Sequence, residues 1–232
     1  MKDLNMNTSR INNGSTRGFT LIELLVVIAI IGVLAGLLLP AGIAIKNKAT
    51  KARVQAELKK VELAIESYKA KLGHYPPDNP NNIAVNPLYF ELLGVKRVGS
   101  QYQTLTGNGV IDSGDLATFY GATPNAPVAG FVNAGASGDD SSASAVSYLK
   151  ELVPAQYMIV QNNAKLGAVL GTTIEGPLML PDPTNTKFIN PFRYNSSSPT
   201  NNINSFDLWV DIKVGKKIFR ICNWRDTPIP NP

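Results

Sequence analysis

A long apolar run dominates the N-terminal part of the chain. From Leu24 to Ile45 there are 22 consecutive residues without a charged side chain. Coiled into an α-helix that rises about 1.5 Å per residue, this run is about 33 Å long, which is enough to cross the hydrocarbon core of a bilayer. The pattern therefore predicts a membrane-spanning helix over residues 19–45.

A second pattern begins where the apolar run ends. Apolar side chains recur every three or four residues, at Val54, Leu58, Val61, Ile65, Tyr68 and Leu72. This spacing places them in one stripe along an amphipathic helix over residues 46–72. Gly73 and the prolines that follow it predict the helix end. The stripe can pack in a coiled coil with another helix or against a sheet of the same chain. We favour the sheet, because six contact positions are few for a coiled coil.

The C-terminal part of the chain predicts that sheet. Apolar and polar residues alternate from Phe206 to Ile212, as in a strand with one buried face. Residues 217–223 predict a second strand after a turn at 214–216, and residues 192–194 predict a short third strand. Residues 86–93 and 146–153 predict short helices, and residues 134–145 a flexible loop. We expect an α+β fold in which a long N-terminal helix packs on a small C-terminal antiparallel sheet.

The net charge and the scarcity of cysteine and histidine limit the functions expected of the chain. The net charge is +5, and basic residues gather just after the apolar run, where they suit phospholipid headgroups. No aromatic residues are interleaved with them, so nucleic acid is not an expected partner. The single cysteine, Cys222, excludes an intrachain disulfide. With one histidine, His74, and no nucleophile elbow, zinc-ligand spacing or phosphate-binding loop, we expect no enzyme activity.

A short motif stands between a polar leader and the apolar run. Residues 1–18 are polar, and the sequence GFTLIE follows at residues 18–23. The apolar run is longer than in an ordinary secretory signal, and no small-residue cleavage site follows it. The motif resembles the N-terminal signal of type IV prepilins and type II secretion pseudopilins. The resemblance implies cleavage between Gly18 and Phe19, methylation of the new amino terminus at Phe19, and assembly roles for Glu23 and the helix-bending Pro40.

Physical chemistry offers a reason for the acid in this motif. Cleavage leaves a positive amine on Phe19, one helical turn before Glu23. A carboxylate at the centre of a membrane costs about 2.5–3.5 kcal/mol. In a bundle of such helices, the carboxylate of Glu23 can instead meet the amine of a neighbour. That contact favours one axial stagger between subunits, as a buried polar residue does in a coiled coil.

Two further stretches extend the resemblance beyond the apolar run. Tyr68, Gly73, Tyr75 and Pro76 match the pattern that closes the helix in the major pseudopilin of type II secretion. Near the C-terminus the matching residues are Asp182, Pro183, Asn190, Pro191, Tyr194, Phe206, Asp207, Asn223 and Trp224. The chain departs from the family at residues 184–189, which replace a tryptophan-glycine pair, and at residues 81–179, which are far longer than the family's middle region.

The resemblance implies a structural role. Residues 1–18 would be a leader, residues 19–45 a single-pass anchor in a bacterial inner membrane, and residues 46–232 a pilin-like periplasmic head. The implied function is polymerisation into a pseudopilus for type II protein secretion. The implied partners are a prepilin peptidase/methyltransferase, other copies of the chain, minor pseudopilins, the inner-membrane secretion platform and lipid. The alternative is a type IV pilin or minor pilin of a surface fibre for adhesion, motility or DNA uptake.

Two places offer ligands for calcium. Residues 104–119 resemble a degenerate EF-hand or dockerin-type loop with Asn108, Asp112 and Asp115 at ligand positions. Two carboxylates predict weak binding, and the favoured alternative is an Asn-Gly turn followed by a short helix that Asp115 caps. Asp207 and Asp211 precede the loop in which the family often binds calcium. A valine replaces the second aspartate of that loop, so we expect Asp207 and Asp211 to face solvent.

Overall fold

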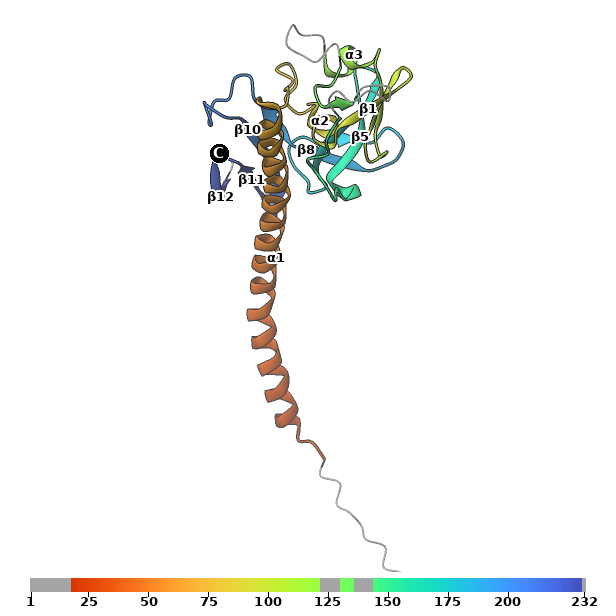
Figure 1. The fold of residues 1–232 in the computed structure, drawn as a ribbon. Helices are drawn as coiled ribbons and strands as arrows, with labels where there is room; N and C mark the ends of the chain where they lie inside the picture. The colour runs from red at the N-terminus through yellow and green to blue at the C-terminus, as the bar shows by residue number, and fades with distance from the viewer. Residues whose placement is uncertain (1–17, 122–129, 136–143, 231–232) are drawn as a thin grey trace, which may run out of the picture. The chain divides into compact units, whose positions relative to one another are not determined.

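The described chain forms two compact units. A computed structural model describes residues 18–121, 130–135 and 144–230, with the side chains of residues 37–41 also outside the described part. The units are Met1–Lys46 and Asn47–Pro232, and helix α1 (Leu21–Leu72) contributes to both (Figure 1). Most of the predicted leader, residues 1–17, and most of the predicted loop at 134–145 lie outside the described residues.

Within the described residues, no helix combines the length and the hydropathy needed to cross a membrane.

The two ends of α1 are set by local chemistry. At the start, the Thr20 hydroxyl oxygen accepts a hydrogen bond from the Glu23 amide (3.3 Å), and the Glu23 carboxylate accepts one from the Thr20 amide (2.8 Å). This reciprocal pair is a capping box. At the end, Gly73 has φ +85° and donates its amide to the Lys69 carbonyl (2.8 Å). A left-handed glycine at this position terminates a helix, which confirms the predicted end.

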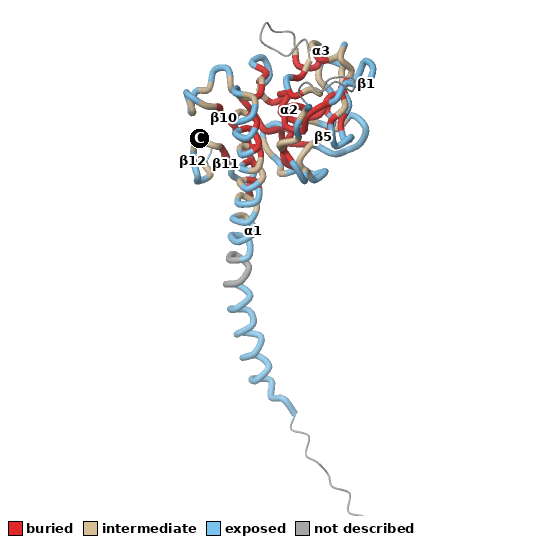
Figure 2. The backbone as a smooth tube through the Cα atoms, viewed as in Figure 1, coloured by how far each residue is buried: buried red, intermediate tan, exposed pale blue. Residues whose placement is uncertain are grey.

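The second half of α1 is buried along one stripe. Val54, Leu58, Val61, Ile65 and Tyr68 are each at most 3% exposed, and Figure 2 colours the buried positions red along this part of the helix. All five belong to one continuous core with residues from the rest of the unit Asn47–Pro232. The stripe is therefore covered by the same chain, which confirms the prediction that it packs on the chain's own structure rather than in a coiled-coil seam.

The C-terminal sheet has the order β12-β11-β10-β9 and is antiparallel throughout. Its strands are β9 (Arg193–Asn195), β10 (Asp207–Val214), β11 (Lys217–Cys222) and β12 (Arg225–Pro230). Gly215, at φ +64°, lies in the turn that pairs Val214 with Lys217. The three predicted strands are thus confirmed. The ammonium of Lys51 on α1 lies 4.3 Å from the ring centre of Phe219 on β11, so this sheet packs beside the helix.

Apart from the short helices α2 (Leu88–Leu93) and α3 (Leu116–Tyr120), the elements that the structure describes between residues 81 and 179 were not predicted from the sequence pattern. The described residues contain two more four-stranded sheets, with orders β3-β2-β1-β4 and β5-β6-β8-β7. The strands of the first are β1 (Val95–Val98), β2 (Gln101–Thr104), β3 (Val110–Asp112) and β4 (Ala134–Gly135). The strands of the second are β5 (Tyr157–Asn162), β6 (Lys165–Thr172), β7 (Leu180–Pro181) and β8 (Phe188–Pro191). Helices α2 and α3 and the 3-10 helix η1 (Pro154–Gln156) complete the head.

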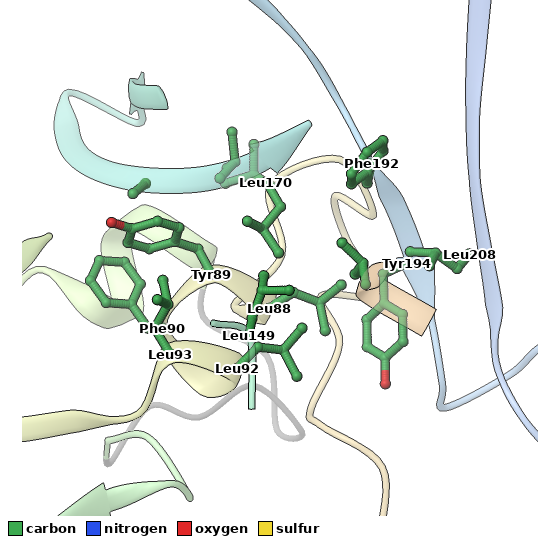
Figure 3. Close-up of a cluster of buried hydrophobic side chains, with 14 of the residues drawn as sticks. Leu88, Tyr89, Phe90, Leu92, Leu93, Leu149, Leu170, Phe192, Tyr194 and Leu208 are labelled. Atoms are coloured by element: carbon green, nitrogen blue, oxygen red, sulfur yellow. The ribbon is translucent and has the colours of Figure 1, made fainter. Parts of the chain in front are cut away.

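One of the two short helices predicted here is confirmed and the other is wrong. Helix α2 lies within the predicted range 86–93, and all its side chains are buried, as Figure 3 shows for the core around it. Residues 146–153 are not helical. The Val146 amide donates to the Asn133 side chain (3.0 Å), and the Tyr148 and Leu149 amides donate to the Leu92 carbonyl (2.8 and 3.1 Å). These tertiary hydrogen bonds replace those that a helix would make.

A buried acid on α2 links α1 to the segment that precedes β4. Glu91 is fully buried, and its carboxylate accepts hydrogen bonds from the Tyr68 hydroxyl (3.0 Å) and from the amides of Val132 (2.9 Å) and Asn133 (3.0 Å). Burial raises the pKa of Glu91 above its ordinary value, although these hydrogen bonds oppose the rise. Glu91 therefore connects the C-terminal end of the α1 stripe to α2 and to the segment before β4.

We predict that Ile65→Ala lowers the free energy of unfolding by about 2–5 kcal/mol, because it removes a fully buried aliphatic side chain. Denaturant unfolding of the full chain in detergent, followed by tryptophan fluorescence, measures the change. Leu63→Ala is the matched control, because Leu63 lies on the same helix but is 58% exposed. Equal small effects for both variants would contradict the burial of the stripe.

Candidate functional site

The predicted processing motif lies at the start of α1. Gly18, Phe19 and Thr20 precede the helix, and Phe19 is 81% exposed. Because the capping box begins the helix at Leu21, the peptide bond between Gly18 and Phe19 stays outside the helical hydrogen-bond ladder. An exposed, non-helical bond is the kind of site that a protease can take into its active site. The geometry is therefore compatible with cleavage at the predicted position.

The carboxylate of Glu23 already has local partners. Its Oε2 atom accepts hydrogen bonds from the Thr20 amide (2.8 Å) and from the Thr20 hydroxyl (2.7 Å). Both residues are exposed in the single chain. The predicted contact with the amine of a neighbouring chain stays a prediction. The predicted bend at Pro40 falls on residues 37–41, whose side chains lie outside the described residues.

The helix that follows the motif exposes apolar side chains on every face. Between residues 21 and 34, exposed fractions range from 45% at Val27 to 82% at Leu21. The residues concerned are Leu21, Ile22, Leu24, Leu25, Val26, Val27, Ile28, Ile30, Ile31, Val33 and Leu34. Apolar surface of this extent is a site of association with lipid or with other protein. A helix that is apolar all round contrasts with the single stripe of residues 54–68.

The first calcium candidates have partners within the protein. Asn108 is exposed in the loop between β2 and β3, but the predicted Asn-Gly turn is wrong, because the hydrogen-bonded turn of this loop runs from Thr104 to Gly107 (2.9 Å) and Asn108 follows it. The Asp112 carboxylate accepts hydrogen bonds from the Ser100 hydroxyl (3.1 Å) and the Gly114 amide (2.9 Å). Asp115 pairs with the ammonium of Lys165 (2.6 Å). These contacts direct the Asp112 carboxylate to the turn between β1 and β2 and the Asp115 carboxylate to β6, rather than to a common centre.

The prediction that Asp115 caps a short helix is confirmed for its position and wrong for its side chain. It occupies the N-cap position of α3, but its side chain makes no capping hydrogen bond. The ion pair with Lys165 holds the carboxylate away from the helix start. The turn before it is tightly packed, because a Cβ atom on Gly109 would lie 2.5 Å from the Tyr89 ring. Glycine is therefore required there by packing rather than by a metal.

The expectation that Asp207 and Asp211 face solvent is wrong. Asp207 is 1% exposed, and its carboxylate accepts hydrogen bonds from the amides of Thr200 (2.8 Å), Asn201 (2.9 Å) and Asn202 (2.8 Å). Asp211 is 7% exposed because Arg220, opposite it on β11, covers it. The sequence pattern could not reveal that a loop and an opposite strand would supply these donors.

The guanidinium of Arg220 binds both carboxylate oxygens of Asp211. Its Nε atom lies 2.7 Å from Oδ1 and its Nη2 atom lies 3.0 Å from Oδ2. A planar two-point pair of this kind is the strong form of a charged hydrogen bond. Among the described residues, no group of three or more histidine, cysteine, aspartate or glutamate side chains is placed to hold a metal ion. The carboxylates of Asp207 and Asp211 are thus both held by donors within the head.

Comparison with known proteins finds matches to the N-terminal region. Residues 14–39 match the prokaryotic N-terminal methylation motif. The chain is similar to the type II secretion system core protein G of Escherichia coli K12, with 46% identity over 63 residues, or 27% of this chain and 43% of that protein. It is similar to the core protein G of Klebsiella michiganensis (42% over 62 residues) and of Klebsiella pneumoniae (45% over 60 residues), each match covering 27% or 26% of this chain.

These matches cover part of the chain and part of each relative. The chain spans 43–44% of the length of these curated relatives. No solved structure gives a significant match to the chain. The similarity to the major pseudopilin of type II secretion thus lies in the N-terminal region.

We predict that the buried carboxylate of Asp207 makes stability depend on acid pH. Burial by itself raises the pKa of Asp207, but the amides of Asn201, Asn202 and Thr200 outweigh it, so the pKa lies below its ordinary value. An unfolded aspartate titrates at about 3.9. The stabilisation is therefore present above that pH and is lost as the pH falls through the lower pKa of the folded state.

Thermal melting of the full chain between pH 7 and pH 2 measures this effect. Asp207→Asn should lower the melting temperature at pH 7, because a neutral amide accepts the three hydrogen bonds less strongly. The same variant should lose less of its remaining stability in acid than the wild type does. Parallel pH profiles for the two proteins would contradict the role assigned to Asp207.

Proposed function

We propose that this chain is a structural subunit of a pseudopilus that serves type II protein secretion. The observation that carries the proposal is the motif at residues 18–23 followed by an apolar helix, within the match to the N-terminal methylation motif and in a region similar to core protein G. An exposed cleavage position, a capped helix start and a helix surface that is apolar except for Glu23 support the same role. The function is structural rather than enzymatic.

Processing is the first step of this role. A prepilin peptidase/methyltransferase cuts the bond between Gly18 and Phe19 and methylates the amine of Phe19. Residues 19–45 anchor the chain in the bacterial inner membrane before assembly, with residues 46–232 as the head in the periplasm. The 22 uncharged residues from Leu24 to Ile45 and the lysines that follow them support this anchoring.

Assembly then uses the apolar surface of α1. Exposed side chains of residues 21–34 contact one another when several such helices pack together, and this packing supplies van der Waals attraction that is independent of register. Glu23 supplies the register, because its carboxylate can pair with the Phe19 amine of a neighbour. Pro40 lets the helix bend between the packed segment and the head. The partners are other copies of the chain, minor pseudopilins and the secretion platform of the inner membrane.

The first test is the mass of the mature protein. The intact mass of membrane-purified protein should correspond to residues 19–232 plus one methyl group. In cells that lack the prepilin peptidase, the mass should include residues 1–18. A mass that retains residues 1–18 in peptidase-containing cells would overturn the processing step and, with it, the proposed function.

The second test is Glu23→Val. This variant should insert into the membrane at least as well as the wild type, because the helix becomes more apolar. Filament yield after shearing should fall sharply, because axial registers come closer in energy once the carboxylate is lost. Val27→Leu is the control, since it alters the same apolar helix without removing a charge. Normal filament yield from stably inserted Glu23→Val protein would contradict the register role.

A further inference from the structure

Basic side chains from two separate parts of the sequence gather at the end of the head where the chain enters it from the apolar run. On α1 they are Lys48, Lys51 and Arg53, and in and after the turn between β10 and β11 they are Lys216 and Lys217. The sequence shows that the first three follow the apolar run, whereas only the fold adds the other two. We call these five residues the basic end.

Strand β11 follows α1 in the same direction, which brings its first residues to this end of the head. The Lys51 ammonium lies 4.3 Å from the ring centre of Phe219, and β11 lies beside α1 in Figure 1. Further along both elements, Leu58 of α1 and Cys222 of β11 line the same cavity. Lys217 precedes Phe219 by two residues, or about 7 Å of strand, which equals the rise of four to five residues of helix. The turn before Lys217 is therefore level with the start of the head on α1.

The charge of the basic end is largely unneutralised. Lys48, Lys216 and Lys217 are exposed, and none of them forms an ion pair within the part of the chain that the structure describes. Arg53 lies 3.6 Å from Glu57, which is a weak pair at a surface. Five cations and this one carboxylate leave a net charge of +4, which is most of the +5 of the whole chain.

The covalent connection to the apolar run places this charge at a membrane surface. The uncharged run ends at Ile45, and Lys48 follows three residues later, or about 4.5 Å along a helix. In the proposed function this run is the membrane anchor, so the basic end lies at the depth of the lipid phosphates. Exposed charges attract one another over about 8–10 Å before salt screens them. Each lysine or arginine within that distance of acidic headgroups adds to the attraction.

We propose that the basic end docks on the headgroups of acidic phospholipids, with Lys216 and Lys217 as the contacts made by the C-terminal sheet. The proposal rests on the proposed function, because it requires residues 19–45 to be the anchor. The turn suits this contact, since Gly215 at φ +64° closes it between paired strands and leaves both lysines exposed. Contacts from α1 and from the sheet together limit how far the head tilts over the membrane before assembly.

Trypsin cleavage of the full-length chain in vesicles tests this docking. The purified chain is reconstituted into vesicles of phosphatidylcholine alone or mixed with phosphatidylglycerol, and mass spectrometry follows cleavage after Lys216 and Lys217. Cleavage after Lys96 and Arg97 is the internal reference, because both are exposed on β1, in another sheet. Relative to this reference, cleavage at the turn should be about fivefold slower in the acidic vesicles, because the turn must leave the headgroups before the protease binds it. High salt should abolish the difference, because it screens exposed charges.

A charge reversal shows whether the protection depends on the basic end. Lys48→Glu leaves both cleavage positions in place and should remove most of the protection in the acidic vesicles. Lys150→Glu is the matched control, since Lys150 is also exposed but lies with Leu63 and Ser67 around a different part of α1. This control should keep the protection. Equal effects of the two variants would overturn docking by the basic end.

The remaining outcomes separate the docking from the proposed function. Alkaline extraction of the same vesicles shows whether the chain is inserted, and native membranes are digested in parallel. Equal cleavage in both kinds of vesicle by an inserted chain would overturn the docking and leave the proposed function standing. Protection found only in native membranes would also overturn it and would assign the basic end to an acidic protein surface. A chain that alkali removes from the vesicles would overturn both the docking and the proposed anchoring.

Discussion

The apolar stripe of α1 is the constraint on which the head depends. An isolated helix cannot cover its own apolar stripe, so other elements must shield these side chains from water. The residues of the stripe are Val54, Leu58, Val61, Ile65 and Tyr68. The C-terminal sheet and α2 provide that cover and share one core with the stripe. On the opposite face of the same helical segment, Leu63 is 58% exposed. One helix therefore has a side that its own head covers and a side that is exposed.

Two acids inside apolar sequence illustrate two ways of accommodating a carboxylate. Glu91 is buried within the head, where its carboxylate accepts hydrogen bonds from the Tyr68 hydroxyl and from two backbone amides. These bonds link α1 to the segment before β4. Glu23 stands at a helix start, where Thr20 satisfies it while the residue stays exposed. A buried and satisfied acid fixes the structure of one chain, whereas an exposed acid in an apolar surface remains available to a second chain. Glu23 thus has a local role in the capping box of α1, and its exposure leaves it free for the assembly role proposed above.

The sequence pattern predicted the elements whose burial is periodic. The stripe of α1 and the alternation along β10 were readable because one face of each is buried. Strand β6 escaped prediction because residues 167–172 are all buried and show no alternation. Residues 146–153 were predicted as helix, but hydrogen bonds to Asn133 and Leu92 hold them in another conformation. The processing motif was readable as a local signal, whereas the burial of Asp207 and Asp211 depends on donors that only the folded chain brings near.

Hydrogen exchange on the full-length protein in detergent, read by mass spectrometry, tests the central claim most directly, because it compares α1 with the sheet in single subunits. If the head covers the stripe, amides of residues 54–68 should exchange as slowly as those of β10, through global unfolding of the head. They should do so before any filament forms. Fast exchange of residues 54–68 in single subunits, with protection that appears only in filaments, would contradict the account, because the stripe would then be covered by neighbouring chains rather than by its own head.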